Sequence, residues 1–138
     1  QNEKLGLIDT ERLQVDWELD ATTMTGSGEI GDQTFHVGLS PFMGVMGVAP
    51  VEAGTHATPP PRYCGGNIDC KELVRGSSLF LPITVEGALF SIGDGHALQG
   101  DGESSDTAIE CPHITRKGRY GADDAKSNYT IRMDYFWF

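Results

Sequence analysis

The sequence is poor in basic residues. Ten lysines and arginines stand against twenty aspartates and glutamates, which gives a formal charge of −10. A surface of that sign repels a phosphate backbone, so nucleic acid is excluded as an expected partner. Long apolar runs are also absent, and those present fall well short of the roughly 20 residues that cross a bilayer. We therefore expect no membrane segment.

Cysteine is scarce and odd in number. Cys64 and Cys70 flank a Gly-Gly turn, and Cys111 lies alone. This pattern fits reduced thiols better than a disulfide framework. No charged-then-apolar signal segment opens the chain. Together these features favour a cytoplasmic protein.

Helical periodicity is missing as well, since no window repeats its apolar residues every 3.6 positions. Alternating apolar residues predict strands instead, and the chain carries 18 glycines and 7 prolines. At 138 residues it is long enough for one domain with a real core. We predict a single mainly β domain, a β-sandwich or barrel. The expected strands cover about 13–19, 35–39, 79–85, 88–92 (returning after a turn) and 129–138, with one short helix at 69–74.

The most informative segment present is GDGHALQGDGE, residues 93–103, which packs Asp94, His96, Asp101 and Glu103 between four glycines. Glycine lets such a loop fold tightly and bring its polar side chains together. Converging carboxylates repel one another unless a cation or a proton lies among them. The segment therefore predicts a divalent metal site. The alternative is a polar turn in which the aspartates bond their own backbone.

Four segments, one of which contains the loop at 93–103, carry a resemblance to a known family. They are PFMGVMGVAP (41–50), GGNIDCKELVRGSSLFLP (65–82), GALFSIGDGHALQGDGE (87–103) and TAIECP (107–112). Over residues 11–112 the chain resembles the acetamidase/formamidase family, whereas residues 113–138 do not match it. The resemblance implies the β-rich fold of that family and a metal-dependent, homo-oligomeric hydrolase. Its expected substrates are small linear amides, formamide or acetamide in type, which give a carboxylate and ammonia.

Members of this family are usually longer and carry an additional N-terminal region. The chain therefore resembles a middle portion of the family's protein. We expect that a complementary fragment of the same protein could complete the site.

The predicted metal ligands are His96 first, then Asp94, with Asp69 of GGNIDC completing the set. Asn67 and Asp69 are two residues apart, so on an extended backbone both point the same way. Asn67 could then bond the substrate amide. The alternative for both is local: Asn67 forms a turn, and Asp69 caps the short helix expected after it.

Two carboxylates compete for the role of general base. Glu103 ends the metal loop, and Glu110 lies in the apolar string TAIECP, where burial would raise its pKa. Glu103 is slightly favoured because it is nearer the loop. Asp101 is expected to support the ligands or bind a second metal, and Cys111 is a less favoured nucleophile. The remaining histidines, His36, His56 and His113, are expected outside the site.

Zinc is the favoured ion, because an imidazole is present and amide hydrolysis suits a strong Lewis acid. Calcium, manganese or iron could also bind such an oxygen-rich set. The main alternative function is a metal-stabilised β-sandwich binding module without catalysis. An open coordination position with a base beside it would distinguish the enzyme from the binding module.

Overall fold

A computed structural model describes residues 13–111, 120–122 and 128–132. These residues form ten strands in three antiparallel sheets and one short 3-10 turn, η2 (Asp101–Glu103). The mainly β class is therefore confirmed. Closure of the sheets into a sandwich or barrel stays a prediction.

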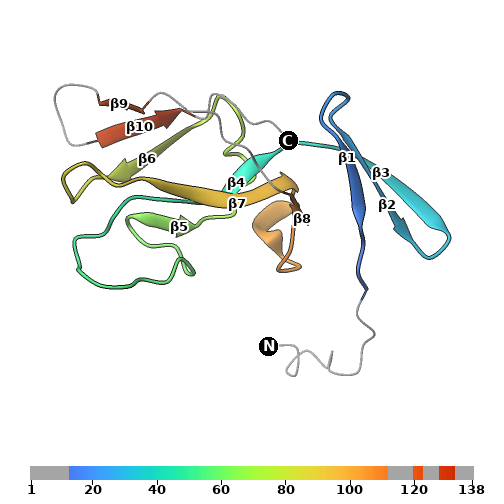
Figure 1. The fold of residues 1–138 in the computed structure, drawn as a ribbon, viewed down its shortest axis with the longest axis horizontal. Coiled ribbons are helices and arrows are strands. Elements are labelled where there is room, and N and C mark those ends of the chain that lie inside the picture. Colours follow the sequence, from blue (N-terminus) through green and yellow to red (C-terminus); the bar gives the residue numbers. More distant parts are fainter. Residues whose placement is uncertain (1–12, 112–119, 123–127, 133–138) are drawn as a thin grey trace.

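The first sheet lies at one end of the molecule, away from the other two (Figure 1). A short loop, Gly31–Asp32, joins its second and third strands, and Gly31 in this loop has a φ of +62°. Such a turn favours glycine because its backbone is left-handed. At the other hairpin, the Asp20 carboxylate accepts the N–H groups of Thr22 and Thr23. The strand order is β1 (Trp17–Asp20), β2 (Thr25–Ile30), β3 (Gln33–Gly38).

The second sheet carries the candidate site. Its order is β5 (Gly65–Asn67), β4 (Phe42–Gly47), β7 (Ser91–Leu98), β8 (Ile109–Glu110). β4 lies in the interior of this sheet, between β5 and β7, and its sequence FMGVMG is largely apolar. Phe42, Met43 and Met46 are indeed all buried. Leu73 packs against the two methionines and completes this part of the core.

The third sheet has the order β6 (Ser78–Pro82), β10 (Asn128–Arg132), β9 (Tyr120–Ala122). The turn predicted at residues 86–87 forms, since Ala88 N–H bonds Val85 C=O. However, Ala88 and Leu89 have positive φ, so the next strand begins only at Ser91 and pairs with β4. Of the strand predicted at 129–138, β10 covers the first part, and residues 133–138 lie outside the described residues.

The short helix predicted at 69–74 is absent from the structure. Asp69 has φ of +47°, whereas an N-cap residue normally lies in the β region. A turn with Leu73 N–H bonded to Cys70 C=O replaces the helix, and Val74 then bridges to Phe42. Asp69 is therefore not a helix cap, and its side chain is left for another role.

Two further expectations can be compared with the described residues. Cys64, Cys70 and Cys111 are thiols, as the odd count predicts. Among the described residues, no helix has the length and apolar character to cross a membrane.

Candidate metal centre

His96 is the centre of the site and is almost fully buried, with 1% of its surface exposed. It lies on β7 opposite Phe42 of β4, whose ring meets the imidazole edge-on, with 5.1 Å between ring centroids. Asp94, two residues earlier on the same strand, points to the same face. Packing on Phe42 thus holds the imidazole in one orientation.

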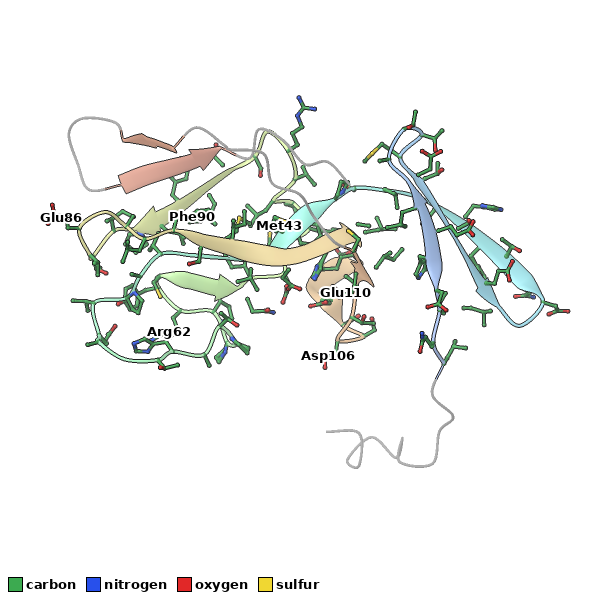
Figure 2. The ribbon with its side chains drawn as sticks, viewed as in Figure 1. Met43, Arg62, Glu86, Phe90, Asp106 and Glu110 are labelled. Atoms are coloured by element: carbon green, nitrogen blue, oxygen red, sulfur yellow. The ribbon has the colours of Figure 1, made fainter. Side chains whose placement is uncertain are left out.

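Three carboxylates face Nε2 of His96. Asp94 Oδ2 lies at 3.4 Å, Glu110 Oε2 at 3.5 Å and Glu103 Oε1 at 3.9 Å. Glu110 is directly opposite His96 in the β7–β8 ladder, and Figure 2 shows it beside the end of β7. Glu103 comes from η2. Three separate backbone segments therefore direct negative charge toward one nitrogen.

Asp69 brings a fourth carboxylate to the same place. Two groups of possible metal ligands result, and within each group the ligand atoms lie within 4.8 Å of one another. The first group consists of Asp69, Asp94 and His96, and the second of His96, Glu103 and Glu110. The His96 ring belongs to both groups. We call the five residues together the His96 cluster: Asp69, Asp94, His96, Glu103 and Glu110.

The loop that presents Asp69 is anchored to β4. The N–H groups of Ile68 and Asp69 both donate to Gly44 C=O, at 2.9 and 3.1 Å. The amide nitrogen of Asn67 donates to Asp69 Oδ2. The other oxygen, Oδ1, is buried and receives no hydrogen bond from an N–H or hydroxyl donor among the described residues, and the carboxyl of Glu103 is close enough to share a proton with Asp69. A buried carboxylate oxygen left in this way needs a cation or a proton.

Gly44 makes room for the cluster. A Cβ atom at this position would lie 2.5 Å from Asp69 Oδ1, 2.6 Å from Asp94 Oδ2 and 3.0 Å from His96 Cε1. Any side chain would thus displace the carboxylates. This role of Gly44 was not predicted from the sequence, although a glycine within an apolar strand is a recognised sign of close backbone approach.

Gln99 is a second residue of the site that was not predicted from the sequence. Its Oε1 lies 2.8 Å from His96 Nδ1, and its Nε2 donates to Asp69 C=O at 2.6 Å. It lies within the quoted string GDGHALQGDGE, but no local pattern there indicates which groups an amide would contact.

Three of the four carboxylates sit on strained backbone. Asp69, Asp94 and Glu103 have φ of +47°, +64° and +46°. Left-handed conformations cost non-glycine residues on the order of 1–2 kcal/mol each. Strain of this kind concentrates at functional sites, where the surrounding structure maintains it.

Burial and mutual repulsion perturb the acids of the cluster. Burial, followed by the charge of Asp94, raises the pKa of Asp69, although the nearby His96 opposes the shift. Burial, followed by the charge of Asp69, raises the pKa of Glu103. A divalent cation among these groups would relieve both effects. The orphaned Asp69 oxygen and this donor set therefore fit such an ion.

Other candidates lie outside the cluster. Asp101 is an exposed partner of Lys71, at 2.6 Å, and belongs to neither ligand group. Burial, with the charge of Glu110, raises the pKa of Cys111 to about 11, which keeps the thiol neutral and disfavours it as a nucleophile. His36 is exposed on β3, and His56 contacts a loop carbonyl. His113 lies outside the described residues.

A cavity of about 350 Å³ opens elsewhere. It is lined in part by Val45, Gly47 and Ser91 and by none of the five cluster residues. In the β4–β7 register these residues alternate with Phe42 and His96, so the cavity lies on the other face of the sheet. The His96 cluster is a separate site.

Comparison with known proteins places these residues in a family. The model of the Acetamidase/Formamidase family matches residues 48–116, half of the chain, and this span includes all five residues of the cluster. It shares residues 48–112 with the predicted resemblance and extends to residue 116, so the prediction that the family match ends at residue 112 is wrong for residues 113–116.

Individual relatives match over shorter segments. An acetamidase from Mycolicibacterium smegmatis is 59% identical over 46 residues, 33% of this chain and 11% of the relative. A formamidase from Methylophilus methylotrophus is 50% identical over 46 residues, with the same two shares. The chain thus spans about a tenth of the length of these relatives. On the match over half of its residues, the chain belongs to the acetamidase/formamidase family.

Proposed function

We propose that this chain carries the metal centre of a hydrolase that cleaves the carbon–nitrogen bond of small linear amides. The observation that carries the proposal is the convergence of carboxylates around His96, among which the buried Asp69 Oδ1 receives no N–H or hydroxyl hydrogen bond from the described residues. The names of the relatives, an acetamidase and a formamidase, support the substrate class.

His96, Asp94 and Asp69 are the proposed ligands, because their donor atoms converge within 4.8 Å. A divalent ion held there, zinc in our proposal, supplies Lewis acidity that activates water and polarises the amide carbonyl. Asn67 fixes Asp69 through its amide nitrogen. Its amide oxygen remains the group that we assign to an N–H of the substrate.

Glu103 and Glu110 are the proposed proton carriers. Amide hydrolysis adds water to the carbonyl carbon, breaks the C–N bond and transfers a proton to the departing nitrogen, which leaves as ammonia. One carboxylate can accept the proton from water and deliver it to that nitrogen. The raised pKa of Glu103, caused by burial and by Asp69, suits this task. Glu110 is more accessible, with 53% of its side chain exposed against 16% for Glu103.

The proposal extends to the whole protein. Because the chain spans about a tenth of its relatives' length, we propose that a complementary segment of the same protein completes the site. A homo-oligomer and a cytoplasmic location belong to the same proposal, as the resemblance and the three thiols support them.

The test is ammonia release from formamide and acetamide by the purified protein, with metal content measured in parallel. We expect release that EDTA abolishes and zinc restores. Release unaffected by complete metal removal would overturn the metal-dependent mechanism.

The five donors of the cluster could instead close the coordination sphere of a structural ion. Metal-loaded protein that releases no ammonia, alone or with co-purifying chains, would favour this alternative, the binding module.

A further inference from the structure

Gln99 joins the two segments that supply the proposed ligands. It follows β7 directly and is buried, with 7% of its surface exposed. Its amide contacts the His96 ring on one side and the Asp69 backbone on the other, at 2.8 and 2.6 Å. A single side chain thus connects two groups, at Asp69 and His96, that are 27 residues apart in the sequence.

The contact with Asp69 determines how the amide is oriented. A backbone carbonyl can only accept a hydrogen bond, so Asp69 C=O faces the NH₂ group of Gln99. The amide oxygen therefore faces His96 Nδ1, which must carry the hydrogen. Among the described residues, Nδ1 has no other hydrogen-bond partner.

A neutral imidazole carries one hydrogen. With that hydrogen on Nδ1, the lone pair of Nε2 points at the carboxylates of Asp94, Glu103 and Glu110. An imidazole nitrogen binds a metal through this lone pair. The opposite tautomer would direct an N–H group to the same place and block ligation.

We propose that Gln99 is a positioning residue that selects the metal-binding tautomer of His96 and holds the Asp69 segment beside it. The inference rests on the proposed function, because the metal site is part of it. A partner on the far nitrogen of a ligating histidine commonly changes metal affinity about ten- to a hundredfold.

Two substitutions separate the two contacts. Methionine is similar in length to glutamine, so Gln99→Met removes both hydrogen bonds with little change in volume. Gln99→Glu keeps an oxygen that can accept from His96 Nδ1 but loses the N–H donor to Asp69 C=O. Gln33→Met, on exposed β3, is the matched control. The first readout is the set of ¹⁵N shifts of the His96 ring in the metal-free protein, measured at a pH where these shifts report a neutral ring. The second is zinc affinity by chelator competition.

We expect hydrogen on Nδ1 in the wild type and in Gln99→Glu, and a substantial Nε2–H population in Gln99→Met. Zinc affinity should fall about ten- to a hundredfold in Gln99→Met, and less in Gln99→Glu. The control should match the wild type.

The inference would be overturned if Gln99→Met kept the ring shifts of the wild type and bound zinc within about twofold of the wild-type affinity. If Gln99→Met does not fold, as judged by circular dichroism, Gln99→Glu decides, because a hydrogen on Nε2 in that variant contradicts the proposed role. Failure of the wild type to bind zinc would refute the proposed metal site alone, since the tautomer is measured without metal.

Discussion

At the scale of single residues, the cluster depends on an imidazole whose reactive nitrogen is surrounded by acids. Three carboxylate oxygens lie 3.4–3.9 Å from His96 Nε2. Such an arrangement is unfavourable unless positive charge enters it. Each side chain can therefore be tested separately for holding the ion and for moving protons.

Replacing His96 with alanine should abolish metal binding and amide hydrolysis together. The proposed nitrogen ligand is lost, and a cavity forms beside Phe42. Metal content and ammonia release measure the effect. His36→Ala is the control, because His36 is exposed on β3. Retention of metal and full rate in His96→Ala would rule out the ligand assignment.

Replacing Glu103 with glutamine should leave the metal bound but slow turnover by about 10²–10⁴-fold, the usual contribution of a positioned proton carrier. Glu110→Gln is the paired variant, because Glu110 faces the same nitrogen and is more exposed. Turnover numbers at matched metal content decide between them. If only Glu110→Gln is slow, the base is Glu110, and two unaffected variants would exclude both.

At the scale of the elements, the site depends on the close pairing of β4 with β7. Gly44 of β4 supplies both empty space and a carbonyl that anchors the Asp69 loop. Sheet pairing alone does not create this geometry, because any other residue at that position would fill the space.

Gly44→Ala should weaken metal binding by at least about tenfold, since its Cβ would lie 2.5 Å from Asp69 Oδ1 and 2.6 Å from Asp94 Oδ2, which belong to two proposed ligands. Gly93→Ala on the facing strand is the control, because a Cβ there meets nothing within 4 Å. Calorimetric zinc titration of both variants measures the difference. Equal affinities would show that the cluster relaxes around a methyl group and that this close approach is not required.

At the scale of the whole molecule, the acids of the cluster link stability to pH. In the metal-free protein, burial raises the pKa of Asp69 and Glu103 above their ordinary values of 3.8 and 4.5. Between the ordinary and the raised values, the folded state binds more protons than the unfolded state. This contribution to the free energy of unfolding therefore falls as pH rises through that window.

A carboxylate outside the cluster, Asp20, changes the free energy of unfolding with pH in the opposite direction. Hydrogen bonds from Thr23 and Thr22 lower the pKa of Asp20, so its contribution is lost as pH falls. The difference between the wild type and Asp69→Asn isolates the effect of the cluster. We expect Asp69→Asn to flatten the decline in urea-unfolding free energy with rising pH in EDTA.

Asp32→Asn, in the exposed β2–β3 turn, should follow the wild type. Saturating zinc should remove the decline in the wild type, because the ion stabilises the ionised carboxylates. Identical pH profiles for the wild type and Asp69→Asn in EDTA would contradict the assigned origin of the shift.

The fold and the site could be predicted from the sequence to different extents. Alternating apolar residues indicated β structure, and Asp94, His96 and Glu103 were identified because a glycine-rich loop concentrates them locally. Asp69 was proposed from its spacing to Asn67, and Glu110 from its place beside apolar residues in TAIECP. The helix at 69–74 was predicted wrongly, because local propensity does not include the hydrogen bonds that hold Asp69 against Gly44.

By itself, then, the sequence determined the residue types of the site, the excess of negative charge and the β-rich class, because these follow from composition and short-range order. Only the tertiary structure decided which carboxylates meet His96, that Gly44 must lack a side chain and that Gln99 contacts Nδ1. The reason is physical. These contacts join segments from 44 to 110 through strand register and loop anchoring, and both depend on packing between parts of the chain that are distant in sequence.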